Sequence, residues 1–181
     1  FSLWDTYRAL HPLFTILHPR RNGEMIRSML AHREQSVHGI LPVWSFGSQE
    51  TWCMIGYHAV SVIADAFLKG ITNFDATAAF EAMKASATYR AYGGLDGYLR
   101  YGYVPVDREK EAASKTLEYA YDDWTIAQMA KALGRQDDHR RLLVIQSALI
   151  DVLDAQIETL RTEMSRCLME LDADEPPPKA A

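Results

Sequence analysis

The sequence predicts an all-α fold, in which amphipathic helices are joined by long loops. Apolar residues recur at spacings of three and four along most of the chain, whereas few segments alternate with the period of a strand. Gly and Pro residues stand between the periodic segments and end them. With 181 residues, 48% of them apolar and 24% charged, the chain has the size and composition of one globular domain. We expect about six or seven helices, and the succession of helical hairpins is compatible with a helical toroid.

The first predicted helix begins at Asn22 and is about 14 residues long, because apolar side chains recur there at helical spacing. Its end is expected near Gly39. The following segment, 39–47, contains Pro42 between two glycines, and its apolar residues are interrupted by polar ones. Proline and glycine in these places exclude a regular helix, so this segment is predicted to be an extended loop.

A buried helix is predicted over 51–69, because apolar residues stand nearly all round it. Ser48 is its expected N-cap, since a serine hydroxyl accepts hydrogen bonds from free backbone amides, and Gly70 ends it. Another helix is predicted over 75–88, where alanines on one side suit close contact between helices.

The second half of the chain begins with a loop and ends with two long helices. The segment 89–107 is rich in Tyr and Gly without a sustained period, and we expect a long ordered loop. A helix is predicted over 114–133, with its first residue, a serine, as N-cap and Gly134 after its end. The last helix is predicted from 137 to about 171, and the proline-rich tail 176–181 is predicted to be disordered.

Charge and composition exclude several classes of function. The net charge of −5 has the wrong sign for attraction to phosphate backbones, so nucleic acid is not expected as a partner. No apolar run approaches the roughly 20 residues that cross a bilayer. Cys53 and Cys167 alone support neither a disulfide framework nor a zinc site. The chain begins at Phe1 without a signal pattern, and we expect it to be a piece of a longer protein.

The densest group of functional residue types is WSFGSQETW, residues 44–52, which places Glu50 among two indoles and a phenyl ring. Burial beside aromatic rings disfavours the charged form of a carboxyl group, as a general acid near neutral pH requires. A position in the first turn of the predicted helix would instead favour the anion through the helix dipole. A general acid and an ordinary helix-start glutamate are both consistent with the residues alone.

A second cluster lies on the helix predicted over 114–133, where Glu118 and Asp122 stand one turn apart on one face. Two carboxylates so placed repel each other unless a cation, a pair of sugar hydroxyls or an arginine lies between them. Neighbouring Tyr and Trp side chains favour partial burial of this face. For Asp122 and Asp123, a solvated acidic face is the equal alternative.

Trp4, Asp5 and Arg8 form a third cluster, in which the carboxylate and the guanidinium also suit a purely structural ion pair. His58 follows Glu50 by two helical turns and would share its face. A single histidine in an apolar helix is usually a core residue, and the other five histidines show no metal-ligand spacing.

The three clusters, in this order, resemble signature segments of the family 92 glycoside hydrolases, the calcium-dependent exo-acting α-mannosidases. The segments are FSLWDTYR at 1–8, ETWCMIGYH at 50–58 and TLEYAYDDW at 116–124, and the similarity extends to about His139. The loop before Glu50 departs from the family pattern in length and in the residues that precede the acid.

This resemblance implies that residues 1–139 are part of an incomplete (α/α)6 barrel, the catalytic domain of the family. It implies Glu50 as the general acid, and Trp4, Asp5 and Glu118 as residues that bind the sugar. It also implies calcium as a cofactor, which needs several oxygen ligands that the sequence does not identify. Inverting members activate water with a second carboxylate. The Asp-bearing, Gly-rich motif that supplies this base is absent from the sequence.

From Arg140 the chain diverges from the family, and residues 140–175 are predicted to form a helical segment. Its apolar residues alternate by three and four, as in a coiled coil, although a surface helix packed on the barrel is an equal alternative. The seam would consist of Ile150, Leu153, Ile157, Leu160, Met164, Cys167 and Leu171.

The sequence predicts two alternative functions. The first is a segment of an inverting, calcium-dependent exo-α-mannosidase, which carries the general acid and lacks the general-base motif. The second is a non-catalytic interaction or carbohydrate-binding module of the same ancestry, which forms oligomers through its C-terminal helix. An α-toroid glycosidase acting on another sugar ranks third. The expected partners are a mannose-containing glycan and either a second copy or the missing remainder of the domain. The resemblance implies a periplasmic or secreted location.

Overall fold

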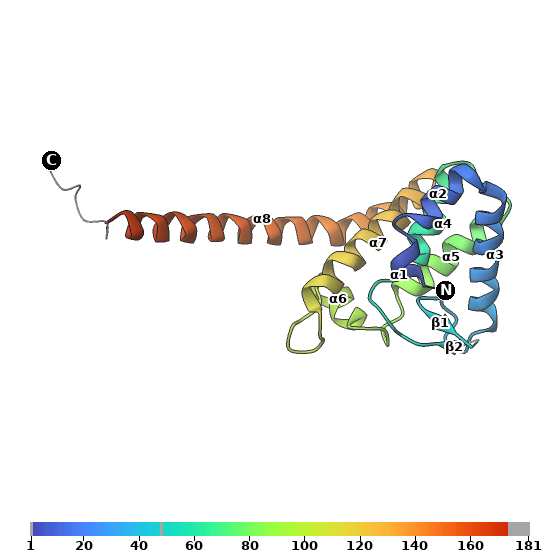
Figure 1. Ribbon diagram of the computed structural model, residues 1–181, viewed down its shortest axis with the longest axis horizontal. Helices are drawn as coiled ribbons and strands as arrows, with labels where there is room; N and C mark the ends of the chain where they lie inside the picture. The colour runs from blue at the N-terminus through green and yellow to red at the C-terminus, as the bar shows by residue number, and fades with distance from the viewer. Residues whose placement is uncertain (1, 48, 174–181) are drawn as a thin grey trace, which may run out of the picture. The chain divides into compact units, whose positions relative to one another are not determined.

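The computed structural model describes residues 2–47 and 49–173, except for the side chains of 145–154, 156–157 and 167–173. The described residues form eight helices and one short hairpin (Figure 1), which confirms the all-α prediction. In chain order, the elements are α1 (Leu3–Thr6), α2 (Leu10–Leu17), α3 (Pro19–Gln35), β1 (Ser45–Phe46), β2 (Gln49–Glu50), α4 (Ala59–Leu68), α5 (Ala76–Ala87), α6 (Leu95–Tyr101), α7 (Ala112–Ala132) and α8 (Gln136–Ala173).

Some of the predictions fall on residues outside this description. They are the N-cap at Ser48, the tail 176–181, and the side chains of Ile150, Leu153, Ile157, Cys167 and Leu171 in the proposed seam. The chain divides into two compact units, residues 1–146 and 147–181. The sequence-based division after residue 139 stays a prediction.

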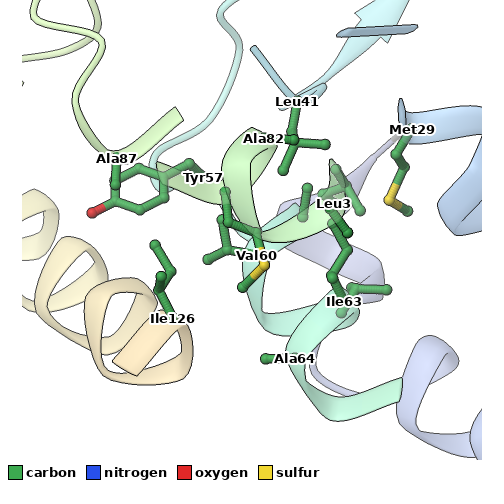
Figure 2. Packing of buried hydrophobic residues seen from close by; sticks show 14 of the residues in the cluster. Leu3, Met29, Leu41, Tyr57, Val60, Ile63, Ala64, Ala82, Ala87 and Ile126 are labelled. Atoms are coloured by element: carbon green, nitrogen blue, oxygen red, sulfur yellow. The ribbon is translucent and has the colours of Figure 1, made fainter. Parts of the chain in front are cut away.

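Helix α4 lies at the centre of the first unit, where it contacts α2, α3, α5 and α7 (Figure 1). It is apolar nearly all round, and Ala59, Val60, Ile63 and Ala66 have no exposed surface. A helix of this kind is stable only when other helices surround it. Figure 2 shows Val60 and Ile63 among core residues from α1, α3, α5, α7 and the loop before β1.

The helix predicted over 51–69 is wrong in its first half, because α4 begins only at Ala59. Trp52, Met54 and Gly56 have φ angles of 58°, 70° and 82°. These left-handed conformations are incompatible with a continuous right-handed helix. The segment before α4 is therefore an irregular loop, although its apolar residues follow the helical pattern.

Other boundaries differ by a few residues for local reasons. Helix α3 begins at Pro19, three residues before the predicted start, because proline suits the first helical position, where its missing N–H has no partner to lose. The loop predicted over 89–107 contains α6, which Gly94 and Gly102 flank with φ angles of 83° and 80°. Helix α7 agrees with the prediction to within two residues, and Gly134 has the expected left-handed conformation.

No helix in the part of the chain that the structure describes combines the length and the apolar character that crossing a membrane requires.

Candidate active site

Glu50 lies in the β1–β2 hairpin, where it pairs with Ser45 in antiparallel register, and not at the start of a helix. The prediction that a helix dipole favours the anion of Glu50 is therefore wrong. Its carboxylate accepts four backbone N–H groups. Oε1 accepts from Trp44, Thr51 and Trp52 at 2.9, 2.9 and 3.2 Å, and Oε2 accepts from Val43 at 2.7 Å. These bonds hold the two sides of the loop together around one side chain.

The two tryptophans on either side of Glu50, Trp44 and Trp52, donate their backbone N–H groups to this carboxylate. The Trp52 ring itself packs with a different group of aromatic side chains. It lies parallel to Tyr89, with ring centroids 5.9 Å apart, and 5.4 Å from Tyr92. The His38 ring meets its edge at 4.8 Å, while His38 Nδ1 lies 2.9 Å from the Tyr89 hydroxyl. The left-handed backbone at Trp52 is thus supported by three aromatic neighbours.

A cavity of about 630 Å³ lies next to this aromatic group. Its lining includes Trp4, Trp52, Tyr92, Glu109, Glu111 and Lys115. The described residues contain three non-glycine positions with positive φ, at Trp52, Met54 and Glu111, and all three line this cavity. Strained backbone of this kind concentrates at functional sites, where the surrounding structure holds it in place. The cavity is the candidate substrate-binding site.

Two of the predicted sugar-binding residues lie near the start of the chain and have different surroundings. Trp4 lines the cavity, and the Arg8 guanidinium stacks on its ring at 4.3 Å. Asp5 is exposed and accepts a hydrogen bond from the Ser2 hydroxyl. Arg8 also donates to the backbone oxygen of Trp4 at 3.0 Å, so it contacts both the ring and the backbone of this residue.

Glu118 belongs to a buried network that links α7 to the start of α4. Its Oε2 lies 2.8 Å from His58 Nε2, and the Tyr7 hydroxyl donates to the same oxygen at 3.4 Å. His58 Nδ1 lies 2.8 Å from Asp122 Oδ1, and Asp122 Oδ2 accepts from the Tyr57 N–H at 2.7 Å. The group expected between the two α7 carboxylates is therefore a histidine ring from another part of the chain.

Asp122 and Asp123 are buried, which rejects the alternative of a solvated acidic face. Burial raises the pKa of Asp122, against the opposing effect of His58. Asp123 accepts from the Tyr57 hydroxyl at 2.8 Å and from the Tyr98 hydroxyl at 3.2 Å. Burial nevertheless raises the pKa of Asp123 to about 7, because two hydroxyl donors compensate only part of the lost hydration.

The sequence alone did not place His58 between Glu118 and Asp122. Its only signal was the pair of carboxylates one turn apart, which required a positive or donating group between them. Nothing in the spacing of the residues indicated which group this is.

The residues present do not form a complete calcium site. Among the side chains that the structure describes, no group of three or more His, Cys, Asp or Glu residues is arranged to hold a metal ion. Calcium takes six to eight oxygen ligands, so a site built from these side chains alone does not fit it.

A cavity with two indoles, a tyrosine and carboxylates at its wall, built in an all-helical domain, is typical of a helical glycoside hydrolase. The comparison with family models agrees, since the glycosyl hydrolase family 92 catalytic domain matches residues 1–164. The chain belongs to this family. This match continues past His139, the position at which the resemblance seen in the sequence ends.

Solved structures of the same family are similar to this chain in sequence and fold. The family GH92 α-mannosidase BT3965 from Bacteroides thetaiotaomicron, solved with mannoimidazole, is 55% identical with a TM-score of 0.78. The family GH92 inverting mannosidase BT2199 from the same bacterium is 39% identical with a TM-score of 0.73. Each comparison covers 80% of this chain, which spans only 19% and 20% of the two proteins.

A curated relative is more distant. It is described as an uncharacterized secreted glycosidase of Arthroderma benhamiae, 30% identical over 99 residues, which are 46% of this chain and 13% of the relative.

Proposed function

We propose that this chain is a segment of an inverting exo-α-mannosidase and that the 630 Å³ cavity is its mannose-binding pocket. The observation that carries the proposal is the cavity wall, where the indoles of Trp4 and Trp52 lie near the Lys115 and Glu109 pair, whose charged groups are 2.9 Å apart. Aromatic faces stack on sugar rings, and paired charged groups suit sugar hydroxyls. The similarity to a mannosidase that was solved with mannoimidazole supports mannose as the sugar.

In this proposal, Glu50 donates a proton to the departing glycosidic oxygen. Glu50 is not among the residues that line the cavity, but its carboxylate accepts from the backbone N–H of Trp52, which does line it. We assign the proton to Oε2, which accepts one backbone N–H, whereas Oε1 accepts three. A hydroxyl oxygen can accept one hydrogen bond and donate another, so Oε2 keeps its contact to Val43 when it is protonated. An inverting reaction also needs a carboxylate about 6.5–9.5 Å away as general base. That base remains unassigned, because its motif is absent from these 181 residues.

Asp5 and Glu118 complete the proposed sugar-binding residues. Neither of them lines the cavity, and the support for both is the family resemblance. Calcium dependence belongs to the proposal on the same ground. A periplasmic or secreted location is likewise proposed, and the description of the fungal relative as secreted supports it.

Replacing Trp4 by Ala is expected to weaken mannoimidazole binding about tenfold, because the ring loses its stacking partner, an effect of about 1.4 kcal/mol. Isothermal titration calorimetry on the purified chain measures this affinity. Leu13→Ala is the control, since Leu13 is an exposed apolar residue of α2 that does not line the cavity. Equal affinity of the Trp4 variant and the unmodified chain would reject the cavity as the mannose site.

A second candidate function is a non-catalytic module that forms oligomers through α8. The observation in its favour is that Leu160 and Met164 are 59% and 65% exposed on this helix. Replacing both residues by Asp is expected to convert an oligomer into a monomer in sedimentation equilibrium, because buried charges oppose a helix seam. A chain that is already monomeric before the change would exclude this function.

A further inference from the structure

A second cavity, of about 470 Å³, is separate from the candidate substrate-binding site. The two cavities have no lining residue in common. Residues from the C-terminal end of α5, from α6 and α7, and from the first turns of α8 line the second one. Its volume lies in the range of about 300–1,000 Å³ that is usual for sites of small molecules. The cavity is therefore large enough to hold a ligand of its own.

Apolar side chains form one part of the cavity wall. Leu99 comes from α6, and Leu142 and Val144 come from α8. Leu142 is partly buried against the hydrophobic core, whereas Val144 is 67% exposed. A hydrocarbon chain in the cavity would remove this apolar surface from water. The described lining contains no aromatic residue, so a sugar ring finds no stacking partner here, in contrast to the candidate substrate-binding site.

Basic side chains form another part of the wall. They are Lys84, Arg90 and Arg141. Lys84 Nζ lies 3.2 Å from an oxygen of Asp138, and Arg90 is paired with Asp96. Arg141 is exposed and forms no ion pair with any side chain that the structure describes. Its guanidinium is therefore the group that is left for an anionic ligand, and its planar fork of donors matches a carboxylate.

The acidic residues of the lining oppose a bound anion only weakly. Asp123 is 1% exposed and accepts from the hydroxyls of Tyr57 and Tyr98. Burial raises the pKa of Asp123 to about 7, so this carboxyl group is largely protonated below neutral pH. Asp138 then remains as the one ionised carboxylate of the described lining, against three basic side chains. The positive side chains of the wall are therefore in excess.

We propose that this cavity binds an anionic amphiphile of the fatty-acid type, with its carboxylate on the Arg141 guanidinium and its hydrocarbon chain against Leu99 and Val144. The two parts of the ligand correspond to the two parts of the wall. The inference goes beyond the proposed mannosidase function, because no residue that lines the candidate substrate-binding site takes part in it.

Isothermal titration calorimetry of the chain with decanoate, below neutral pH, tests the proposal. We expect saturable binding of one decanoate per chain, and binding about tenfold weaker in Arg141→Gln, because an uncharged amide replaces the charged donor. Arg140→Gln is the matched control. Arg140 is the neighbouring exposed arginine of α8, is paired with Asp137 and does not line the cavity. Absence of saturable binding, or an equal loss of affinity in both variants, would overturn the proposal.

Changes in the ligand test the two parts of the wall separately. Each CH2 group removed between decanoate and hexanoate is expected to lower the affinity by up to about fourfold, because less apolar surface is buried. Decyltrimethylammonium has the same chain length and the opposite charge, and it is expected to bind more weakly than decanoate. Equal affinity of the cationic and anionic amphiphiles would contradict the role of Arg141.

Nuclear magnetic resonance of the methyl-labelled chain locates the bound decanoate. We expect the methyl signals of Leu99 and Leu142 to move on titration. The signals of Leu13, an exposed apolar residue of α2 that lines neither cavity, are expected to stay in place. Shifts of Leu13 as large as those of Leu99 would show unspecific binding to apolar surface and would reject the cavity as the site.

Discussion

Replacing Glu50 by Gln is expected to lower the rate of α-mannobioside hydrolysis by about 10²- to 10⁴-fold, the usual contribution of a general acid. The amide cannot protonate the departing oxygen of a sugar, which is a poor leaving group. The rate with 2,4-dinitrophenyl α-mannoside is expected to fall far less, because a dinitrophenolate leaves without protonation. Steady-state kinetics with both substrates measures the difference in a longer protein that contains this segment together with its general base, because the base motif is absent from these 181 residues.

The same experiment distinguishes a general acid from a residue that only shapes its loop. The Glu50 carboxylate accepts N–H groups from both sides of the hairpin, and Gln retains one acceptor oxygen for the three bonds of Oε1. In the Gln variant an NH2 group faces the N–H of Val43, so some loss of loop order is expected. Loss of loop order would slow both substrates equally, and that result would contradict the assignment of Glu50 as acid. Glu34→Gln, at an exposed position of α3, is the matched control.

The second large effect expected is a loss of stability as the pH rises, caused by Asp123. Burial raises the pKa of this carboxyl group from 3.8 to about 7 in the folded chain, so the folded state holds a proton that the unfolded state releases. This contribution is complete below about pH 4 and is lost as the pH rises through 7. A shift of about 3 units corresponds to roughly 4 kcal/mol at 1.36 kcal/mol per unit.

Urea unfolding of the chain and of Asp123→Asn between pH 4 and pH 8 measures this effect. The Asn variant is expected to match the unmodified chain near pH 4 and to be the more stable one at pH 8, because it has no charge to bury. Asp96→Asn, whose carboxylate is exposed and paired with Arg90, serves as the control and should leave the pH profile unchanged. A constant difference between the Asn variant and the unmodified chain across this range would show that Asp123 does not release a proton there.

The long helices could be predicted because their signals are local. The apolar spacing of α7 and the glycine after its end agree with the structure to within two residues. The helix predicted over 51–69 begins too early, because several residues before Ala59 are apolar and nothing in the sequence marks their left-handed backbone. The hydrogen bonds from the loop to Glu50 and the packing of the His58 ring against Gly56 decide that conformation, and both need neighbours that periodicity does not specify.

The sequence by itself determined the helical class, the family and the segments that carry the candidate site. The spacing of apolar residues and the order of the motifs can both be observed without knowing how the chain folds. Only the tertiary structure decided that Glu50 sits in a hairpin, that Trp52 faces Tyr89, and that His58 stands between Glu118 and Asp122. His58 and Asp122 are 64 positions apart. The energy of a buried charge depends on which groups surround it in space. The order of residues along the chain does not specify how close such groups come in the folded protein.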